Sequence, residues 1–119
     1  MTSHLILPQS LRIKRKDHFN LIFSANKKRY GTFLILHYIL GTEETQAAFV
    51  AGKRVGNAVK RNKAKRILKE GFRTIQHSIV YPSHLIFIAK DTIFSSCASS
   101  LNKELNSLFS SIGLLHEPH

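Results

Sequence analysis

Acidic residues are scarce in this chain of 119 residues: seven Asp and Glu stand against eighteen Lys and Arg, giving a formal net charge of +11 at pH 7. The few acids are dispersed, so the clustered carboxylates that two-metal hydrolysis requires are missing. Such an excess of positive charge repels itself in the folded state, and a polyanionic partner relieves that repulsion. We therefore expect nucleic acid as the first candidate partner and an anionic membrane surface as the second.

Cysteine is nearly absent as well. Cys97 stands alone, which excludes an internal disulfide or a cysteine-based zinc site and is typical of a protein from the reducing cytoplasm. Its neighbourhood, SSCASS, carries no charge, so we expect a packed or unreactive thiol rather than a catalytic one. The seven histidines are scattered, and His116 and His119 lie at a chain end, so we expect no metal site in the protein.

Long hydrophobic runs, internal repeats and low-complexity segments are missing too. The start, MTSHLILPQS, has only a short apolar run that Pro8 interrupts, from which we expect neither a signal peptide nor a membrane span. Hydrophobic residues make up 43% of the chain, which is typical of a globular protein. We expect residues 1–119 to form a single domain with one modest core, and residues 1–10 and 114–119 to be flexible ends.

The spacing of apolar residues predicts a mixed fold. Strands are expected at 27–31, 32–40, 46–53 and 84–90, with 32–40 and 46–53 pairing as a hairpin across the polar turn GTEET. Helices are expected at 14–26, over roughly 20 residues from an N-cap at Asn57, and at 95–115. The long helix has an apolar stripe of Ala64, Ile67, Leu68, Gly71, Phe72, Ile75 and Ile79, and the last helix has one of Leu101, Leu105 and Leu108. Together these elements predict a small α+β sandwich.

The positive charge is concentrated in two segments. Seven cations lie in the first thirty residues and nine between Lys53 and Arg73. On the long helix, Asn62, Arg66, Lys69 and Arg73 share the face opposite the apolar stripe, and Glu70 is the only acid nearby. A helix that is basic only for solubility would alternate Glu and Lys at four-residue spacing, which this one does not. Because the preceding GKRVGN also has two glycines that let backbone N–H groups approach an anion, we interpret this region as a grip for a phosphate backbone.

The stretch KRVGNAVKRNKAKRILKE, residues 53–70, resembles the RNR motif of the protein subunit of bacterial ribonuclease P. RIKRKDHFNLIF, HLIFIAK and CASSLNKELNSLF are similar to other parts of that family, so the resemblance covers nearly the whole chain. It implies a single-domain α+β sandwich of order α-β-β-β-α-β-α with a left-handed βαβ crossover. The composition and spacing alone would not predict that handedness, since right-handed crossovers are the strong default.

The resemblance also implies a function. The protein would bind the catalytic ribonuclease P RNA, one copy to one, and the 5′ leader of precursor tRNA. It would assist the Mg²⁺-dependent endonucleolytic removal of the leader in the cytoplasm. The RNA would carry the chemistry and hold most of the Mg²⁺, so the protein would contribute no catalytic residue.

The family's RNA-binding positions map onto polar and basic residues of the long helix and the turn before it. The aromatic pair that lines the leader-binding cleft corresponds to Phe19 and Phe23, although spacing alone favours a core role for them; Phe33 is assigned to the same cleft. The sheet tyrosine of some members would correspond to Leu36, His37 or Tyr38. The RNA-binding residues implied in this way are Lys53, Arg54, Asn57, Arg61, Asn62, Lys63, Lys65, Arg66 and Lys69, with Arg73 added from the helical spacing.

Two other functions remain open from the residues alone. A ribosomal or general RNA-binding protein without an enzymatic partner would show the same composition. A DNA-binding regulator is a weaker alternative, since RNKAKR offers point charges without an evident two-helix unit for the major groove.

Overall fold

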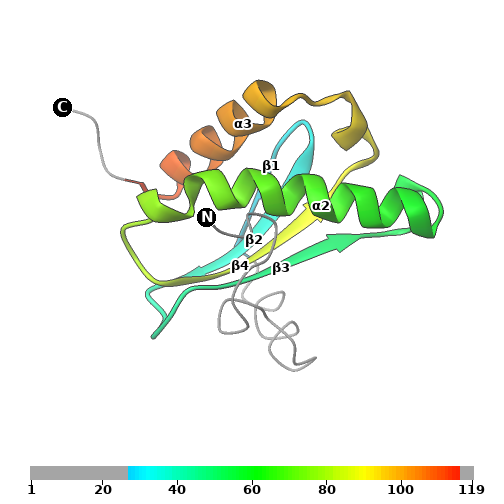
Figure 1. Ribbon diagram of the computed structural model, residues 1–119. Coiled ribbons are helices and arrows are strands. Elements are labelled where there is room, and N and C mark those ends of the chain that lie inside the picture. The colour runs from blue at the N-terminus through cyan, green and yellow to red at the C-terminus, as the bar shows by residue number, and fades with distance from the viewer. Residues whose placement is uncertain (1–26, 116–119) are drawn as a thin grey trace, which may run out of the picture.

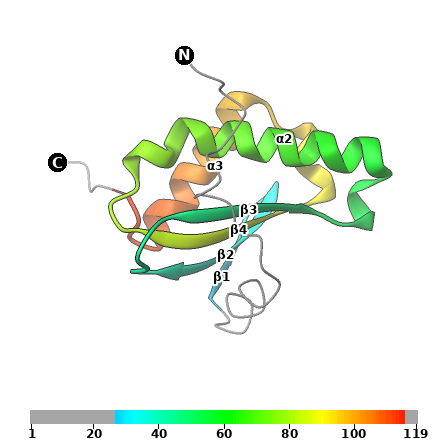
Figure 2. The same ribbon diagram turned by 60° about the horizontal axis from the view of Figure 1, so that its bottom comes forward.

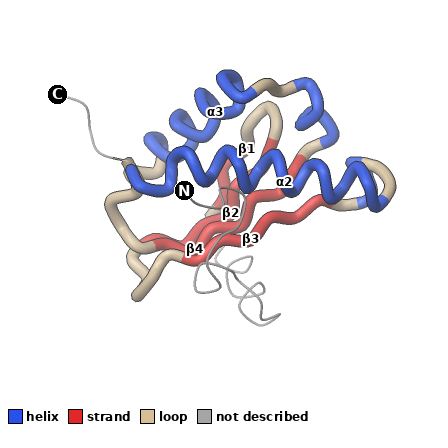
Figure 3. The backbone as a smooth tube through the Cα atoms, in the orientation of Figure 1, coloured by secondary structure: helices blue, strands red, loops and turns tan. Residues whose placement is uncertain are grey.

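The computed structural model describes residues 27–115 and shows two layers, a four-stranded sheet and a pair of helices on one of its faces (Figures 1 and 3). The view in Figure 2 shows the same two helices side by side on that face. The predicted first helix lies outside the described residues. The strands are β1 Lys28–Tyr30, β2 Leu34–Leu40, β3 Gln46–Ala51 and β4 Ser83–Ala89, the helices are α2 Ala58–Ile75 and α3 Ala98–Ser111, and short 3-10 turns are η2 Lys53–Val55, η3 Gln76–Ser78 and η4 Asp91–Ser95.

The strand order in the sheet is β1-β2-β4-β3, which corrects the predicted hairpin. β2 pairs antiparallel with β1 and with β4, while β3 pairs in parallel with β4. β4 therefore lies between the two strands that were expected to be partners. Its sequence SHLIFIA is almost entirely apolar, and most of its residues are buried, which suits a central strand better than an edge strand. β3 and β4 are joined through α2 and form the predicted βαβ crossover.

Alternation along the strands directs one set of side chains toward the helices. Leu34, Leu36 and Tyr38 of β2 are buried on this face together with Leu85 and Phe87 of β4. Four phenylalanines from β3, α2, β4 and α3 meet here, with ring centroids 5.2 to 6.1 Å apart. Burial of such rings contributes roughly 1.5–3 kcal/mol each, so this cluster fixes both helices on the sheet. Its members are Phe49, Phe72, Phe87 and Phe109.

The long helix begins where the sequence predicts. The side chain of Asn57 caps it, because Oδ1 accepts a hydrogen bond from the backbone N–H of Lys60 at 3.0 Å. The helix ends at Ile75 and continues as the turn η3, somewhat before Pro82. Five residues of the predicted stripe are buried and two, Ile67 and Ile79, are half-buried. The buried five are Ala64, Leu68, Gly71, Phe72 and Ile75.

The two helices pack closely at Gly71. A Cβ atom at this position would lie 2.9 Å from Leu105 Cδ1 and 3.0 Å from Leu101 Cδ2, closer than such atoms normally approach. Leu101, Leu105 and Leu108 face the core as predicted. Glycine therefore lets α3 approach the backbone of α2.

The end of the fold extends two residues past the predicted boundary. Leu114 is fully buried in the core, and its carbonyl accepts a hydrogen bond from Val80 N at 2.9 Å. Leu115 forms a bridge with Ile79. Both residues were predicted to belong to a flexible end. They do not, because the apolar side chain of Leu114 packs in the core. No helix in residues 27–115 is long and apolar enough to cross a membrane.

Candidate nucleic-acid interface

Most of the residues predicted to bind a phosphate backbone lie on the polar side of α2. Asn62, Lys63 and Arg66 are exposed along it, whereas Lys65 and Lys69 are half-buried. None of these side chains is inside the core, whose α2 members are all apolar. The helix of 18 residues is about 27 Å long and is held by its buried stripe, so the cations are displayed on a rigid support.

The turn before the helix adds further exposed groups. Lys53, Arg54 and Asn57 are exposed, while Val55 between them is buried and anchors the turn. Two of the backbone N–H groups in this turn are engaged within it. Val55 N donates to Gly52 O and Gly56 N donates to Lys53 O, each at 3.1 Å, so both N–H groups are used within the turn. These two N–H groups are therefore not available to an anion.

The predicted residues fall on more than one flank of the helix. Arg61, Asn62 and Lys65 line a hollow of about 220 Å³ beside the end of β3. Arg66 borders a larger groove of about 500 Å³ between α2 and α3, whose floor includes Ile67 and other apolar groups. Arg54 lines a third hollow, next to Asp91. A ligand that contacts all of these cations must therefore be extended, as a nucleic-acid strand is.

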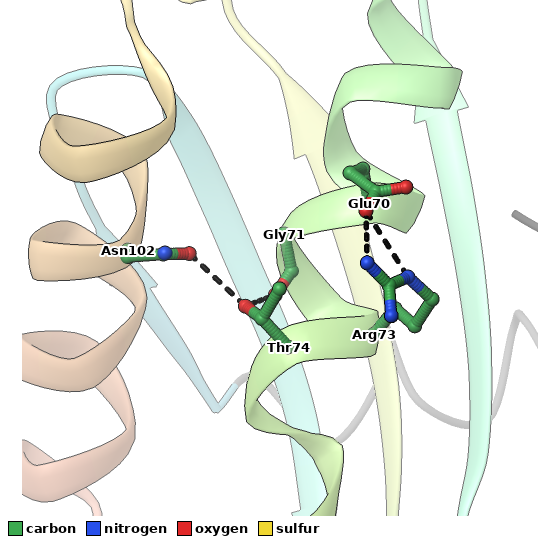
Figure 4. Close-up of polar contacts among 5 residues, drawn as sticks. All are labelled: Glu70, Gly71, Arg73, Thr74 and Asn102. Carbon is green, nitrogen blue, oxygen red and sulfur yellow. Dashed lines mark hydrogen bonds and ion pairs between the residues drawn. The ribbon is translucent and has the colours of Figure 1, made fainter. Parts of the chain in front are cut away.

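Arg73 differs from the other predicted cations. Its guanidinium forms an ion pair with Glu70, with Nε 3.0 Å from the carboxylate oxygen Oε1 (Figure 4). The pair lies three residues apart on α2 and is partly exposed. Because Glu70 compensates its charge, Arg73 is a weaker candidate for phosphate binding than Arg66, which lies about two helical turns earlier.

Figure 4 also shows how α2 and α3 are joined near this pair. The Thr74 hydroxyl donates to Gly71 O at 2.7 Å and lies 3.1 Å from the side-chain oxygen of Asn102 on α3. This polar contact closes the C-terminal end of the groove between the helices. The groove is thus a fixed feature of the helix pair rather than a gap between independent elements.

The three candidates for the sheet tyrosine position lie on two different faces of the sheet. Leu36 and Tyr38 are buried beneath the helices, whereas His37 points to the other face. It stands opposite Lys28 of β1 and Ile86 of β4 on that face. Burial, and to a smaller extent the charge of Lys28, lowers the pKa of His37.

The predicted leader cleft is only partly within the described residues. Phe19 and Phe23 lie outside them. Phe33 is half-buried and packs against the core on the helix side of the sheet, away from His37. This placement favours a core role for Phe33 over the predicted role in the cleft.

Two features were missed by the sequence reasoning. Cys97 is exposed, not packed, and hydrogen bonding with the hydroxyls of Ser100 and Ser99 lowers its pKa to about 6. Phe94, in the turn η4, has its ring 5.9 Å from Lys63 Nζ. The serines two and three residues after Cys97 were a local signal for the first feature, whereas the second depends on the folded chain because η4 is far from Lys63 in sequence.

Comparison with known proteins agrees with the family resemblance found in the sequence. The family described as Ribonuclease P matches residues 7–113. A ribonuclease P protein component of Nitratiruptor is 30% identical over 101 residues, covering 84% of this chain and 90% of the relative.

Solved structures extend the comparison to the fold. The RNase P protein of Staphylococcus aureus superposes with a TM-score of 0.75 at 20% identity, covering 89% of this chain and 98% of the other. The RNase P protein of Thermotoga maritima does so with a TM-score of 0.70 at 21% identity, covering 82% and 94%. These likenesses confirm the predicted α+β fold class.

Proposed function

Because the chain belongs to the ribonuclease P protein family, we propose that it is the protein subunit of a ribonucleoprotein that removes the 5′ leader of precursor tRNA. In this proposal one copy of the protein binds one copy of the catalytic RNA through the exposed cations of α2 and of the turn before it. The activity is that of an endoribonuclease in tRNA 5′ maturation, and the RNA carries the chemistry. A cytoplasmic location fits this role.

The observation that carries the proposal is the separation of the two sides of α2. Ala64, Leu68 and Phe72 are buried against the sheet, whereas Lys63 and Arg66 point away from it. Each cation that meets a phosphate releases condensed counterions, which favours binding without any base-specific contact. An RNA held mainly by its backbone suits such a surface.

Leader binding is assigned to Phe19 and Phe23, as the family resemblance implies. Stacking of an unpaired base on an aromatic ring contributes roughly 1–3 kcal/mol and tolerates any base. That tolerance suits a protein that must accept precursor tRNAs with different leaders.

Magnesium is assigned mainly to the RNA. Mg²⁺ takes oxygen ligands, chiefly carboxylates and phosphates. Within residues 27–115, no three His, Cys, Asp or Glu side chains come together in a group that could hold a metal ion. The described residues do not fit a magnesium site, and we derive no catalytic step in the protein.

Reconstitution tests the proposal. The catalytic RNA of ribonuclease P is incubated with precursor tRNA at low Mg²⁺, with and without this protein, and release of the 5′ leader is measured. We expect the protein to increase cleavage at the mature 5′ end. If cleavage does not increase and the protein binds unrelated RNAs equally well, the alternative of a general or ribosomal RNA-binding protein is favoured.

A further inference from the structure

An exposed aromatic ring stands next to the cationic side of α2. Phe94 belongs to the turn η4 between β4 and α3, which lies beside α2 (yellow-orange in Figure 1). Its side chain is 37% exposed, whereas Ile93 before it is fully buried. No function was predicted for this turn from the sequence, and the predicted RNA-binding residues all lie between Lys53 and Arg73.

The backbone that carries Phe94 is firmly held. Ile93 N donates to Lys90 O at 2.9 Å, and the Ser96 hydroxyl donates to Ile93 O at 2.6 Å. The Thr92 hydroxyl donates to Thr32 O, which ties the turn to the loop after β1. The ring is therefore presented on a fixed support, so little conformational entropy is lost when a ligand packs against it.

The ring lies close to one cation of α2. Lys63 Nζ lies 5.9 Å from the ring centroid, and Val59, one helical turn earlier on the same side of α2, is 76% exposed. Asp91, the acid of this turn, lines the separate hollow beside Arg54. The aromatic ring and the apolar side chain suit the flat base of a nucleotide. The ammonium group of Lys63 suits its phosphate.

We propose that Phe94 is a stacking platform for an unpaired nucleobase of the RNA that lies along α2, with Lys63 binding the phosphate of the same or the adjacent nucleotide. The deep, narrow major groove of an RNA duplex is closed to side chains, so proteins read RNA chiefly where bases are unpaired. Arg66, three residues after Lys63, continues the path of the phosphates along the helix. This site extends the interface beyond α2 and rests on the proposed function.

The absence of tryptophan from the chain gives a direct test. The variant Phe94→Trp contains a single tryptophan at the site, and its fluorescence is followed while the catalytic RNA of ribonuclease P is added. Tyr81→Trp is the matched control, because Tyr81 is also exposed but follows the far end of α2. We expect saturable quenching in Phe94→Trp and little change in Tyr81→Trp; equal responses would overturn the proposal.

Binding measurements test the energetic contribution of the ring. Loss of one stacked base predicts that Phe94→Ala weakens binding of the same RNA by about fivefold or more. Phe94→Tyr should bind like the wild type. The salt dependence of Phe94→Ala should be unchanged because no charge is lost, whereas Lys63→Ala should make it shallower. Thermal unfolding of each variant checks that the fold is intact.

The outcomes separate this site from the proposed function. If the wild-type protein fails to bind the catalytic RNA, both fall. If the wild type binds, Arg66→Ala weakens binding and Phe94→Ala does not, the stacking site alone is refuted.

Discussion

Replacing Glu104 with alanine should destabilise the fold, because this carboxylate holds the loop between β1 and β2. Glu104 projects from α3, and its two oxygens accept hydrogen bonds from Thr32 N at 2.7 Å, Phe33 N at 2.8 Å and Leu34 N at 3.2 Å. The approach depends on Gly31, where a Cβ atom would lie 2.2 Å from the carboxylate. A single side chain thus connects the last helix to the start of the sheet.

The magnitude follows from the donors that would lose their partner. Thr32 N is exposed and can bind water, but the bonds of Phe33 N and Leu34 N are part-buried. An unsatisfied buried donor costs about 1–3 kcal/mol, and partial access of water places the two together at about 2–3 kcal/mol. For a domain of this size that corresponds to a decrease in Tm of about 10 °C.

The assay is thermal unfolding of three variants in the same buffer. Glu104→Ala should show the full decrease, and Glu104→Gln, which keeps one acceptor oxygen, about half of it. Glu43→Ala is the control, because Glu43 is an exposed acid in the turn before β3 and its loss changes the net charge equally. Equal Tm values for Glu104→Ala and Glu43→Ala would refute the reasoning.

Three further predictions concern the leader, the thiol and the helix contact. Phe19→Ala should weaken binding of precursor tRNA more than binding of mature tRNA in the reconstituted enzyme. Equal losses of affinity for the two RNAs would favour a core role for Phe19. Alkylation of Cys97 by iodoacetamide should rise with pH around a midpoint near 6, since its pKa is lowered to about 6, and Ser100→Ala should move the midpoint upward. A midpoint near the usual value of about 8.5 in the wild type would contradict this. Gly71→Ala should lower the free energy of unfolding in urea by about 1 kcal/mol, because the clash with Leu105 outweighs the gain in helix propensity; a more stable variant would show that the leucines shift freely.

Local patterns predicted the elements of the fold well. The capping residue Asn57 and the apolar stripe from Ala64 to Ile75 follow from the 3.6-residue period, which depends only on the helix itself. The strand order could not be predicted in this way. Insertion of β4 between β2 and β3 is decided by which apolar strand gains most from a central position, and that depends on the whole sheet.

The candidate site likewise has features that could be predicted from the sequence and features that could not. The exposed cations Lys63 and Arg66 could be predicted because their face is set by the helix period. The ion pair of Arg73 with Glu70 also follows from that period, because the two residues are three apart on the helix. The approach of Phe94 to Lys63 could not be predicted, since the path of the chain after β4 decides it. The resemblance to a family supplied the partner and the reaction, which no periodicity contains.

The central claim, that the outer face of α2 meets an RNA backbone, is tested most directly by the salt dependence of RNA binding. Affinity for the catalytic RNA is measured from about 50 to about 200 mM KCl for the wild type, Arg66→Ala and Lys103→Ala. Lys103 is an exposed cation on α3 and serves as the control. The slope of log K against log salt should become shallower by about 0.7 to 0.9 for Arg66→Ala and stay unchanged for Lys103→Ala. An unchanged slope for Arg66→Ala, or an equal change in both variants, would contradict the assignment.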